Sequence, residues 1–436
     1  MQAAIDACFE SGGGRLVIPS GMKILTGTLW LKSNIELHLE EEAVIVGGTQ
    51  REDYHPSERE LWYVIAARNA SNVSITGPGE INGQAHSFVL EYREEKNVML
   101  SWNRRSDNCN EEDQEQCRPR LVGFIDCANV TVKDVHLTEP AFWCLHIVRC
   151  DTTTVRNVTI YGDFNIPNND AIDVDGSNNT VVEGCHISTG DDGVCAKTKA
   201  GPTFNLSASN CWIRSKSSAV KIGSEVRYDM ANLSFVNMTI VASHRGIAIQ
   251  ARDAGNVSDV SFVNVSISTR YYDPSWWGRA EPIYITSVPR RETTVRGALR
   301  NVTVTNVTAR SENGIVIAGC PGHEIEQLRL ENISIEIGKW SQYPGGLLDY
   351  RPGYRGLVPH RTVGVFAEHV AQLGFKSVRI EWGSQPQLDW GMLIDMTPGT
   401  VKEVTFDGFS SSQPSAYEKH RETRGDSGII SLFQTS

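Results

Sequence analysis

Five aspartates between residues 168 and 199 are the side chains whose type and spacing best suit catalysis. The segment reads NNDAIDVDGSNNTVVEGCHISTGDDGVCAKTK, and its acids are Asp170, Asp173, Asp175, Asp191 and Asp192. Carboxylates normally face solvent, so acids embedded between apolar, strand-like stretches need a further explanation. Two carboxyl groups held close together raise at least one pKa, which leaves a protonated acid beside an ionised base. Hydrolysis of a glycosidic bond uses such a pair.

These acids come together only if the fold stacks distant residues, and a repeat in the sequence predicts such a fold. A polar turn ending in Asn precedes a short alternating apolar strand, as in NVTVKDVHL from Asn129 and NVTIYG from Asn157. From Asn129 to Asn232 this unit recurs at spacings of 28, 22, 26 and 27 residues. Periods of about 20–30 residues made of strands and turns predict a solenoid.

We therefore predict an all-β fold, a single-stranded right-handed parallel β-helix. Each coil carries alternating apolar residues that it cannot cover alone, and stacking coils about 4.8 Å apart buries them. The pattern of leucine-rich repeats is absent, and the Asn-Gly and Asp-Gly turns typical of hairpins are rare. Asp170 and Asp191 are 21 residues apart, about one coil, so we expect them on one face with Cα atoms about 5 Å apart. Asp192 should lie beside them.

The chain of 436 residues shows no linker, charge block or low-complexity tract, so we predict one domain over residues 1–436. Residues 1–30 should form an N-terminal cap and the first coil, with a helix whose Ile5 and Phe9 cover the open end of the solenoid. Residues 85–117 form an acidic insertion, which could close one end of a groove and favour exo action. Residues 340–361 are expected to be a loop beside that groove.

Acidic clusters also have simpler roles, which we expect for two of the five acids. Asp173 and Asp175 could bind calcium or cap backbone amides in a solvated turn. For Asp170, Asp191 and Asp192 we favour catalysis. No cysteine pair or Cys/His cluster has zinc spacing, so we predict neither a metal nor another cofactor.

Two motifs around the acids resemble those of the polygalacturonase-like family, glycoside hydrolase family 28. Asn-Asn-Asp-Ala at 168–171 is similar to its Asn-x-Asp-Gly motif, and Ser-Thr-Gly-Asp-Asp at 188–192 with Lys197 is similar to its Gly-Asp-Asp motif. The opening AIDACFESGGGRLVIPSG and the segments around Arg118 and His146 resemble its cap and middle coils, so the likeness covers about residues 2–270. The resemblance implies that Asp191 is the general acid and that Asp170 and Asp192 position and deprotonate the attacking water, with inversion. Asn168 and Lys197 would contact the substrate.

The chain departs from that family at two places. The Gly-His-Gly motif corresponds to Ser217-Ser218-Ala219, which lacks the histidine, although Gly-Ser-Glu at 223–225 follows. The Arg-Ile-Lys motif, which in the family grips a galacturonate carboxylate, corresponds to residues 248–250, Ala-Ile-Gln. Losing a charge-assisted hydrogen bond would cost about 1.5–3 kcal/mol, so another cation should substitute. The candidates are Lys221, Arg227, Arg245 and Arg252, of which we favour Lys221.

Aromatic residues in predicted loops could pack against the faces of sugar rings. Trp276 and Trp277 lie in RYYDPSWWGRAEPIYI, residues 270–285, and are expected to form a subsite wall, with packing of the loop onto the solenoid as the alternative. His146 and His360 could also enter the site, although a single histidine is more often structural.

Composition limits the partners of the protein. The net charge of −11 disfavours nucleic acid, and no apolar run approaches the roughly 20 residues of a membrane span. We expect a secreted monomer that acts on a polysaccharide or oligosaccharide. Among the ten cysteines, Cys109 and Cys117 could form a disulfide, whereas Cys185, Cys195 and Cys211 could pair or stack inside. Thirteen Asn-x-Ser/Thr sequons predict either glycans at a few sites or simply turns before β-branched strands.

The leading hypothesis is a glycoside hydrolase that cleaves a pectin-like or other uronate-containing polysaccharide. A polysaccharide lyase is the first alternative, although a lyase needs an Arg or Lys base and usually calcium, whereas this site is acidic. A non-catalytic carbohydrate-binding β-helix is the second, because the histidine and the Arg/Lys pair are missing. Crowded carboxylates have no use in a groove that only binds, which favours the hydrolase.

Overall fold

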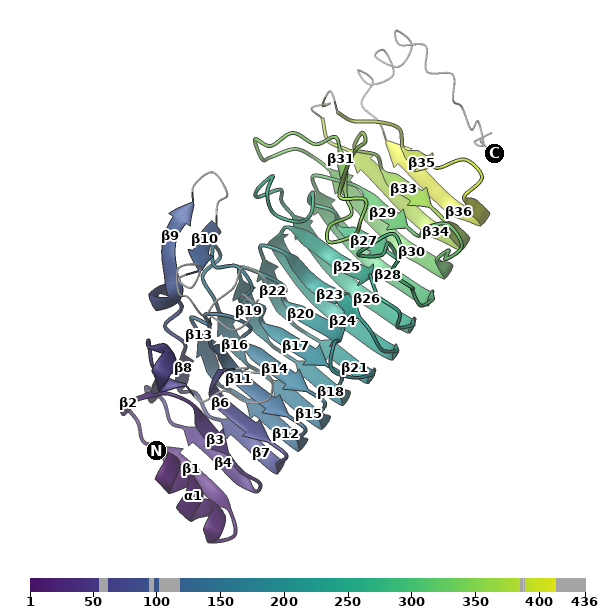
Figure 1. Cartoon of the computed structure of the whole chain (residues 1–436). Coiled ribbons are helices and arrows are strands. Elements are labelled where there is room, and N and C mark those ends of the chain that lie inside the picture. Colours follow the sequence, from purple (N-terminus) through teal and green to yellow (C-terminus); the bar gives the residue numbers. More distant parts are fainter. Residues whose placement is uncertain (55–61, 94–97, 102–117, 385–386, 388, 413–436) are drawn as a thin grey trace.

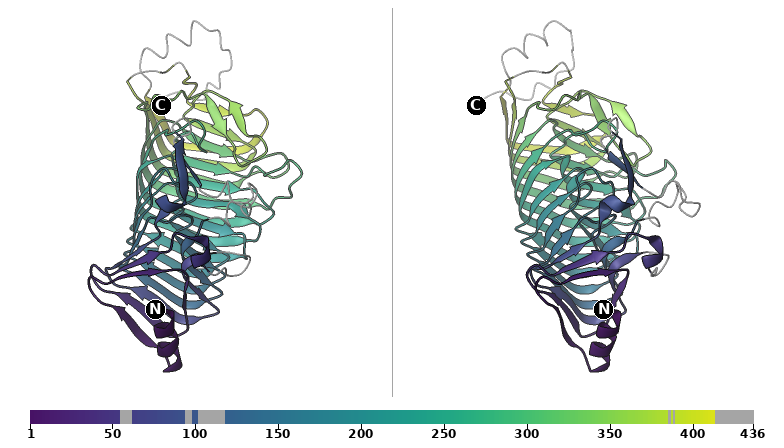
Figure 2. Two further views of the ribbon diagram at one scale, coloured as in Figure 1. Left: turned by 60° about the vertical axis from the view of Figure 1, so that its left-hand side comes forward. Right: turned by 90° about the vertical axis from the view of Figure 1, so that its left-hand side faces the viewer.

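A computed structural model describes residues 1–54, 62–93, 98–101, 118–384, 387 and 389–412. The strands stack along one axis into a column that runs from the N-terminal to the C-terminal coils (Figure 1). Two further views show the same column from other sides, with the N-terminal helix at one end (Figure 2). This is the predicted right-handed parallel β-helix.

Two large parallel sheets build the column. The site lies on the twelve-stranded sheet, whose strands in order are β3 (Leu29–Leu31), β6 (Tyr63–Arg68), β11 (Arg120–Ile125), β14 (Leu145–Val148), β17 (Ile172–Asp175), β20 (Val194–Thr198), β23 (Ser218–Val226), β25 (Arg245–Ala251), β27 (Ile283–Thr286), β29 (Ile315–Ala318), β33 (Val365–Glu368) and β35 (Ile394–Met396).

The second sheet has twenty strands and winds around the rest of each coil. Its first half comprises β1 (Gly14–Ile18), β2 (Lys23–Thr26), β4 (Ile35–Leu39), β5 (Val44–Gly47), β7 (Ser71–Thr76), β8 (Glu80–Asn82), β12 (Ala128–Lys133), β13 (His136–Thr138), β15 (Asp151–Arg156) and β16 (Thr159–Tyr161). Its second half comprises β18 (Asn178–Glu183), β19 (His186–Thr189), β21 (Thr203–Ser209), β22 (Trp212–Ser215), β24 (Met230–Ser243), β26 (Val257–Thr269), β28 (Leu299–Ser311), β30 (Glu326–Ile337), β34 (Val370–Trp382) and β36 (Val401–Ser412).

Helix α1 (Gln2–Glu10) lies against β1, β3 and β4 at the N-terminal end. Ile5 is fully buried, as expected for a cap. The expectation for Phe9 was wrong, because its ring is 42% exposed and the ammonium of Lys32 lies over it at 5.1 Å. Met1 and Cys8, which are partly buried, pack against the core beside Ile5 instead. Among the described residues, no helix has the length and apolar character needed to cross a membrane.

The repeated asparagines form ladders along the outside of the column. Three side-chain amides each donate to the side-chain oxygen of the asparagine one coil earlier, at 2.9–3.2 Å. The pairs are Asn129 with Asn72, Asn205 with Asn179, and Asn232 with Asn205. These residues have φ between 54° and 60°, in the left-handed region that Asn tolerates better than most residues. The sequon asparagines therefore have a structural use, and glycosylation stays a prediction.

The cysteines in the described residues are free thiols, and seven of the eight are buried. Cys185 and Cys211 lie on neighbouring coils, and each thiol donates to the carbonyl two residues before it, at 3.6 and 3.2 Å, so they stack without a disulfide. Cys195 lies beneath the site and donates to the carbonyl of Gly223. Cys109 and Cys117 lie outside the described residues.

The coils differ most in their loops. Strand pairing places His146, Asp173, Cys195, Lys221 and Ala248 on consecutive rungs, 22–27 residues apart. The next rungs follow at Tyr284, Val316 and Phe366, after 36, 32 and 50 residues, so the loops beyond the site are longer.

Part of the predicted insertion at 85–117 is described. It contains the 3₁₀ helix η3 (Ala85–Phe88) and an antiparallel pair, β9 (Val89–Arg93) and β10 (Val98–Ser101), which projects from the coils in Figure 1. Residues 94–97 and 102–117 lie outside the described residues, so the predicted effect of the insertion on a groove stays a prediction.

Candidate active site

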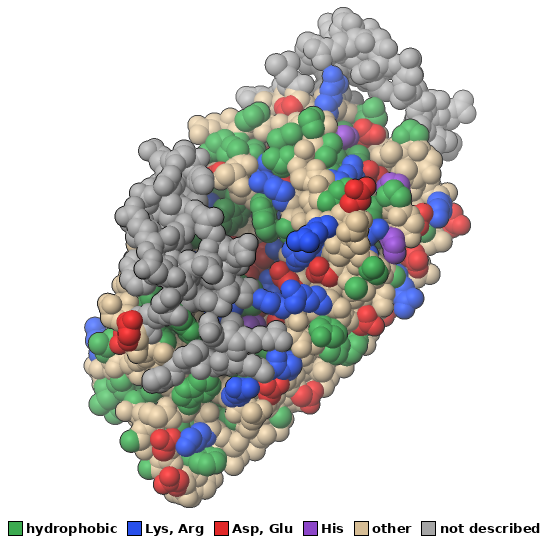
Figure 3. Space-filling view, viewed as in Figure 1, with side chains coloured by type: hydrophobic (Ala, Val, Ile, Leu, Met, Phe, Trp, Pro, Cys, Tyr) green, Lys and Arg blue, Asp and Glu red, His purple; other side chains and the backbone are tan. Residues whose placement is uncertain are grey.

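A pocket of about 490 Å³ lies against strands β17, β20 and β23. It falls within the range of about 300–1,000 Å³ typical of small-molecule sites. Acidic and basic side chains gather in a hollow near the middle of the face seen in Figure 3. The pocket is lined by Phe142, Trp143, Pro167, Asn168, Asp170, Asp191, Asp192, Lys197, Ser217, Lys221, Ser224, Glu225, Ser275, Trp276, Trp277 and Arg290.

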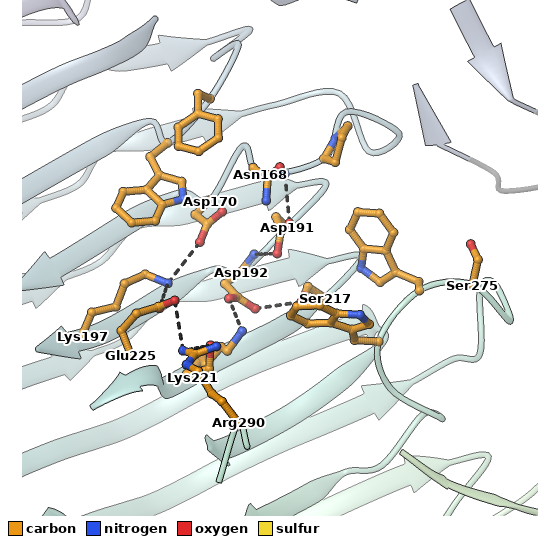
Figure 4. Close-up of a pocket in the computed structure, with 16 residues that line it drawn as sticks. Asn168, Asp170, Asp191, Asp192, Lys197, Ser217, Lys221, Glu225, Ser275 and Arg290 are labelled. Atoms are coloured by element: carbon orange, nitrogen blue, oxygen red, sulfur yellow. Dashed lines mark hydrogen bonds and ion pairs between the residues drawn. The ribbon is translucent and has the colours of Figure 1, made fainter. Parts of the chain in front are cut away.

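The three predicted catalytic acids meet in this pocket (Figure 4). Asp170 immediately precedes the β17 rung, and Asp191 and Asp192 precede the β20 rung. One carboxylate oxygen from each residue lies within 4.8 Å of those of the other two. The register differs from the prediction by one residue. Ile172 pairs with Val194, an offset of 22, so Asp192 stacks next to Asp170 while Asp191 lies one residue before it.

Backbone hydrogen bonds fix the orientation of Asp191. Its Oδ2 accepts from the Asn168 amide at 2.9 Å, and its Oδ1 accepts from the Asp192 amide at 3.0 Å. The guanidinium of Arg118 in turn holds the Asn168 turn, because it donates to Asn168 Oδ1 at 2.9 Å and to the Pro167 carbonyl at 2.5 Å. Asn168 therefore positions the acid through its backbone as well as lining the pocket.

Asp192 is held by three donors. Lys221 Nζ lies 2.6 Å from Oδ2, while Ser217 Oγ and the Ser218 amide donate to Oδ1 at 2.8 and 3.2 Å. Ser217 belongs to the segment that replaces the family's histidine motif, and its hydroxyl contacts a predicted catalytic acid. Lys221, favoured above as a substrate contact, is committed to this carboxylate.

The surroundings push the pKa values of the three acids apart. Burial, with the neighbouring Asp192 charge, raises the pKa of Asp191 to about 6. Burial and the nearby charges of Asp173 and Asp191 raise the pKa of Asp170 well above its usual range. Burial also opposes ionisation of Asp192, but Lys221 and Lys197 outweigh it and hold the pKa of Asp192 below its ordinary value. The site therefore combines protonated carboxyls with one firmly ionised carboxylate.

Lys197 lies at the centre of a second group of acids. Its Nζ is 3.6 Å from Asp170, 3.5 Å from Asp173 and 3.6 Å from Glu225, and 4.9 Å from the centre of the Trp143 ring. The expected solvated turn was wrong for Asp173, which is completely buried behind the pocket. For Asp175 the capping role is confirmed, because Oδ1 accepts from the amides of Lys199 and Ala200 at 2.7 and 2.9 Å, although this residue is also buried.

The trio of Asp170, Asp191 and Asp192 is the group of described residues close enough to hold a metal ion. Oxygen ligands of this kind would suit calcium or magnesium. A bound cation would have to compete with the ammonium of Lys221, which already contacts Asp192 at 2.6 Å. The positive charge that the carboxylates need is thus supplied by the protein.

Aromatic side chains lie on both sides of the acids along the axis of the β-helix. Phe142 and Trp143 come from the turn before β14, on the N-terminal side, whereas Trp276 and Trp277 come from the long loop before β27. Trp277 is 42% exposed, so its ring is available to a ligand. The predicted wall formed by Trp276 and Trp277 therefore lines the pocket, and Trp143 is an aromatic residue that the sequence did not single out.

Two predicted substrate contacts do not line the pocket. His146 is buried behind Trp143, whose ring it meets edge-on at 4.8 Å, and its Nδ1 lies 2.8 Å from the Tyr63 hydroxyl. Burial lowers the pKa of His146 to about 4, so the imidazole is neutral. Arg252 is fully buried, with Tyr284 and the Tyr350 carbonyl beside it. His360, which instead lies beside Asp395, does not line the pocket either.

Arg290 is the cation at the pocket that sequence reasoning missed. Its Nε donates to Asp253 at 3.1 Å and its Nη2 to Ser224 and Glu225 at 3.1 and 3.2 Å. Its side chain is 31% exposed, against 5% for Lys197 and 6% for Lys221. It follows β27, two rungs after Lys221, and no motif marks it. Ser224 and Glu225 were visible in Gly-Ser-Glu, but without an assigned role.

Known proteins resemble this chain in sequence and in fold. It is 25% identical to the exo-poly-α-D-galacturonosidase of Dickeya chrysanthemi over 311 residues, which are 61% of this chain and 51% of that protein. The chain thus spans about half the length of this relative. It is 24% identical to the endo-polygalacturonase of Pectobacterium carotovorum subsp. carotovorum over 351 residues, 77% of this chain and 83% of that one.

A solved structure confirms the fold. The hyperthermoactive exopolygalacturonase from Thermotoga maritima matches with a TM-score of 0.64 and 24% identity, over 87% of this chain and 86% of that one. The sequence profile described as "Glycosyl hydrolases family 28" matches residues 8–343, which is most of the chain. The expected resemblance is therefore confirmed, and this protein belongs to glycosyl hydrolases family 28.

Proposed function

We propose that this protein hydrolyses glycosidic bonds in a pectin-like, uronate-containing polysaccharide. The observation that carries the proposal is the meeting of Asp170, Asp191 and Asp192 within 4.8 Å in one pocket, where the surroundings favour a protonated Asp191 below about pH 6 beside an ionised Asp192. Relatives named for exo- and endo-cleavage of galacturonan support the substrate class. A polymer of this kind is met outside the cell, which supports secretion.

In the proposed reaction, Asp191 donates its proton to the glycosidic oxygen as that bond breaks. A water molecule attacks the sugar from the other face, and Asp192 accepts the proton that this water loses. Asp170, kept protonated by its surroundings, orients the water by hydrogen bonding. Both protons then exchange with solvent to restore the starting state.

The contacts of the acids favour water over a protein nucleophile. Three of the roughly four acceptor sites of the Asp192 carboxylate are used, two at Oδ1 by Ser217 and Ser218 and one at Oδ2 by Lys221, which leaves one site at Oδ2 for a proton from water. Bonding to the sugar would require Asp192 to give up some of these contacts. A protonated Asp170 is a poor nucleophile. We therefore propose inversion, as the family resemblance implies.

Arg290 is the proposed contact for a substrate carboxylate. Its Nη1 is the guanidinium nitrogen for which the described residues show no hydrogen bond, while Nε and Nη2 are used. It lines the pocket and is more exposed than either lysine there. It would thus replace the missing cations at residues 248 and 250.

The lyase alternative fits the pocket less well. A lyase base must be a neutral Lys or Arg close to the sugar. Lys221 and Lys197 are each surrounded by carboxylates, and the pKa of Lys221 lies above its ordinary value because Asp192 outweighs burial. Both therefore stay charged. A role limited to binding would leave the split pKa values of the acids unexplained.

Product release from a panel of polysaccharides tests the proposal. Homogalacturonan, rhamnogalacturonan, glucuronan and neutral polymers are incubated with the wild type and with Asp191→Asn, with and without EDTA. We expect new reducing ends on a uronate polymer, without products that absorb ultraviolet light as unsaturated sugars do. Asp191→Asn should lose several orders of magnitude in turnover, and EDTA should have no effect.

The matched control is Glu336→Gln, which neutralises an exposed carboxylate on β30 that pairs with Arg310. This variant should keep full activity. Unsaturated, EDTA-sensitive products would instead identify a lyase. Binding to one polymer without release from any would identify a carbohydrate-binding protein.

A further inference from the structure

One row of equivalent positions crosses the twelve-stranded sheet and links the pocket to the C-terminal coils. Consecutive rungs place in this row Asp173, Cys195, Lys221, Ala248, Tyr284, Val316 and Phe366. Next to the pocket the row holds Asp173 and Lys221, and beyond Lys221 it is apolar or aromatic. The last four residues are 0, 0, 2 and 4% exposed, so other parts of the protein cover them.

A hairpin of the protein covers this apolar part of the row. It consists of β31 (Leu347–Asp349) and β32 (Leu357–Pro359), which pair antiparallel. Leu348 and Tyr350 belong to one buried cluster with the row residues Ala248, Tyr284, Val316 and Phe366. The hairpin lies within the 50-residue connection between the β29 and β33 rungs. The protein's own chain thus occupies the surface beyond Lys221.

The segment that replaces the family's Arg-Ile-Lys motif holds this hairpin. Gln250 Nε2 donates to the Arg351 carbonyl at 3.1 Å, and Ala248 packs in the buried cluster below the hairpin. Arg252 Nη2 lies 3.5 Å from the Tyr350 carbonyl. These side chains, which would face a sugar in an open groove, instead contact the protein.

Asp349 anchors the hairpin in the interior. Its Oδ2 accepts from the Gly278 amide at 2.8 Å and lies 3.2 Å from Arg279 Nη1. Its carbonyl accepts from Arg245 Nη2 at 3.0 Å and from the Tyr284 hydroxyl at 2.7 Å. Because Asp349 is almost completely buried, this network holds the hairpin as a fixed wall.

The same hairpin is joined to the aromatic side of the pocket. Arg351 donates from Nη1 to the Ser275 carbonyl at 3.1 Å and from Nη2 to the Trp276 carbonyl at 2.7 Å. Ser275, Trp276 and Trp277 line the pocket. The hairpin and the tryptophan loop therefore form one continuous barrier on the C-terminal side of the catalytic acids.

We propose that residues 347–359 end the substrate groove just beyond the pocket, so that the enzyme accepts only the end of a sugar chain. The proposal rests on the proposed function and deepens it, since it specifies chain-end rather than internal cleavage. The end that occupies the pocket packs against Trp276 and Trp277.

The first test follows wild-type enzyme on the uronate polymer that it cleaves, by viscometry and by sizing the products over time. We expect the shortest oligosaccharides to accumulate from the earliest samples while the viscosity falls slowly. Early oligosaccharides of intermediate length, with a rapid loss of viscosity, would overturn the proposal.

The second test uses defined oligosaccharides blocked at one end, either by a 2-aminobenzamide on the reducing end or by a benzyl ether on the non-reducing end. We expect one block to reduce hydrolysis at least tenfold and the other to be tolerated, which also identifies the end that meets the hairpin. Equal hydrolysis of both blocked compounds and the free one would contradict a closed groove.

The third test opens the barrier by replacing residues 350–356 with Gly-Gly, so that only two glycines connect Asp349 to Leu357. If this variant folds, as judged by circular dichroism, it should gain internal cleavage. Calorimetric titration of Asp191→Asn with the same blocked oligosaccharides keeps the proposal testable without turnover. If the wild type hydrolyses none of these compounds, the proposed function is refuted. If Asp191→Asn binds oligosaccharides with blocked and free ends equally well, only the closed groove is refuted.

Discussion

The ammonium of Lys221 lies 2.6 Å from Oδ2 of Asp192, and both side chains are nearly completely buried. The pair fixes the ionisation of the site, because the positive charge keeps Asp192 deprotonated despite its burial. Among the described residues no ammonium forms such a close pair with Asp191, and its pKa is raised to about 6. The lysine thus separates the pKa values of two adjacent carboxyl groups.

Replacing this lysine should damage both stability and catalysis. In Lys221→Met, Asp192 is buried without its counter-charge, which should cost roughly 3–5 kcal/mol of unfolding free energy. Turnover should fall by roughly 10²–10⁴-fold, the contribution typical of a general base. The acid limb of the pH–rate profile should move to higher pH. Lys221→Arg, which keeps the charge, should show a smaller loss and an unshifted limb, and identical profiles for the two variants would contradict the role of the charge.

The activity should be greatest at acidic pH. Asp191 must be protonated to act, so its ionisation through about pH 6 should reduce kcat/KM on the alkaline side. Asp192 must be ionised, and its lowered pKa keeps it so below the usual range of aspartate. A pH–rate profile measured between pH 3 and 9 checks this. A rate that still rises between pH 7 and 9 would exclude Asp191 as the acid.

Arg290 should determine the preference for charged substrates. Arg290→Gln should lower kcat/KM on the de-esterified polymer by roughly 10–100-fold, because it removes a charge-assisted hydrogen bond of about 1.5–3 kcal/mol. The loss should be much smaller on a methyl-esterified polymer, whose carboxyls are neutral. Arg291→Gln, which changes the exposed neighbour outside the pocket, serves as the matched control. An equal loss on both polymers would assign Arg290 a structural role.

The first product should have the inverted anomeric configuration. The nearest carboxylate oxygens lie within 4.8 Å, which is closer than the roughly 6.5–9.5 Å between carboxyl groups that is common in inverting enzymes. Inversion is expected instead from the contacts that occupy Asp192 and the protonation of Asp170. Proton NMR of the earliest product from an α-linked oligosaccharide should show the β anomer. Initial α product would make one of these carboxylates a nucleophile.

Much of the architecture was readable because its signals are local. An asparagine that accepts a left-handed φ, followed by alternating apolar residues, predicts one turn and one strand of a coil, and the structure confirms stacked asparagine turns at Asn129, Asn205 and Asn232. Asn157 belongs to a second row of turns, where it contacts Asp134. The acids before β17 and β20 were readable for the same reason, since one period of the repeat separates them. They were predicted to form a catalytic group from the type and spacing of the residues alone.

The remaining features depend on contacts between distant segments. The offset of 22 rather than 21, which places Asp192 next to Asp170, is set by strand pairing. Arg290 reaches the pocket from two rungs away, and the hairpin at 347–359 contacts the tryptophan loop from within a 50-residue connection. The sequence by itself determined the solenoid and its acidic centre, because periodicity and short motifs encode both. Only the tertiary structure decided which cation reaches the pocket and which surface its own chain covers, because long loops follow no repeat and are positioned by packing.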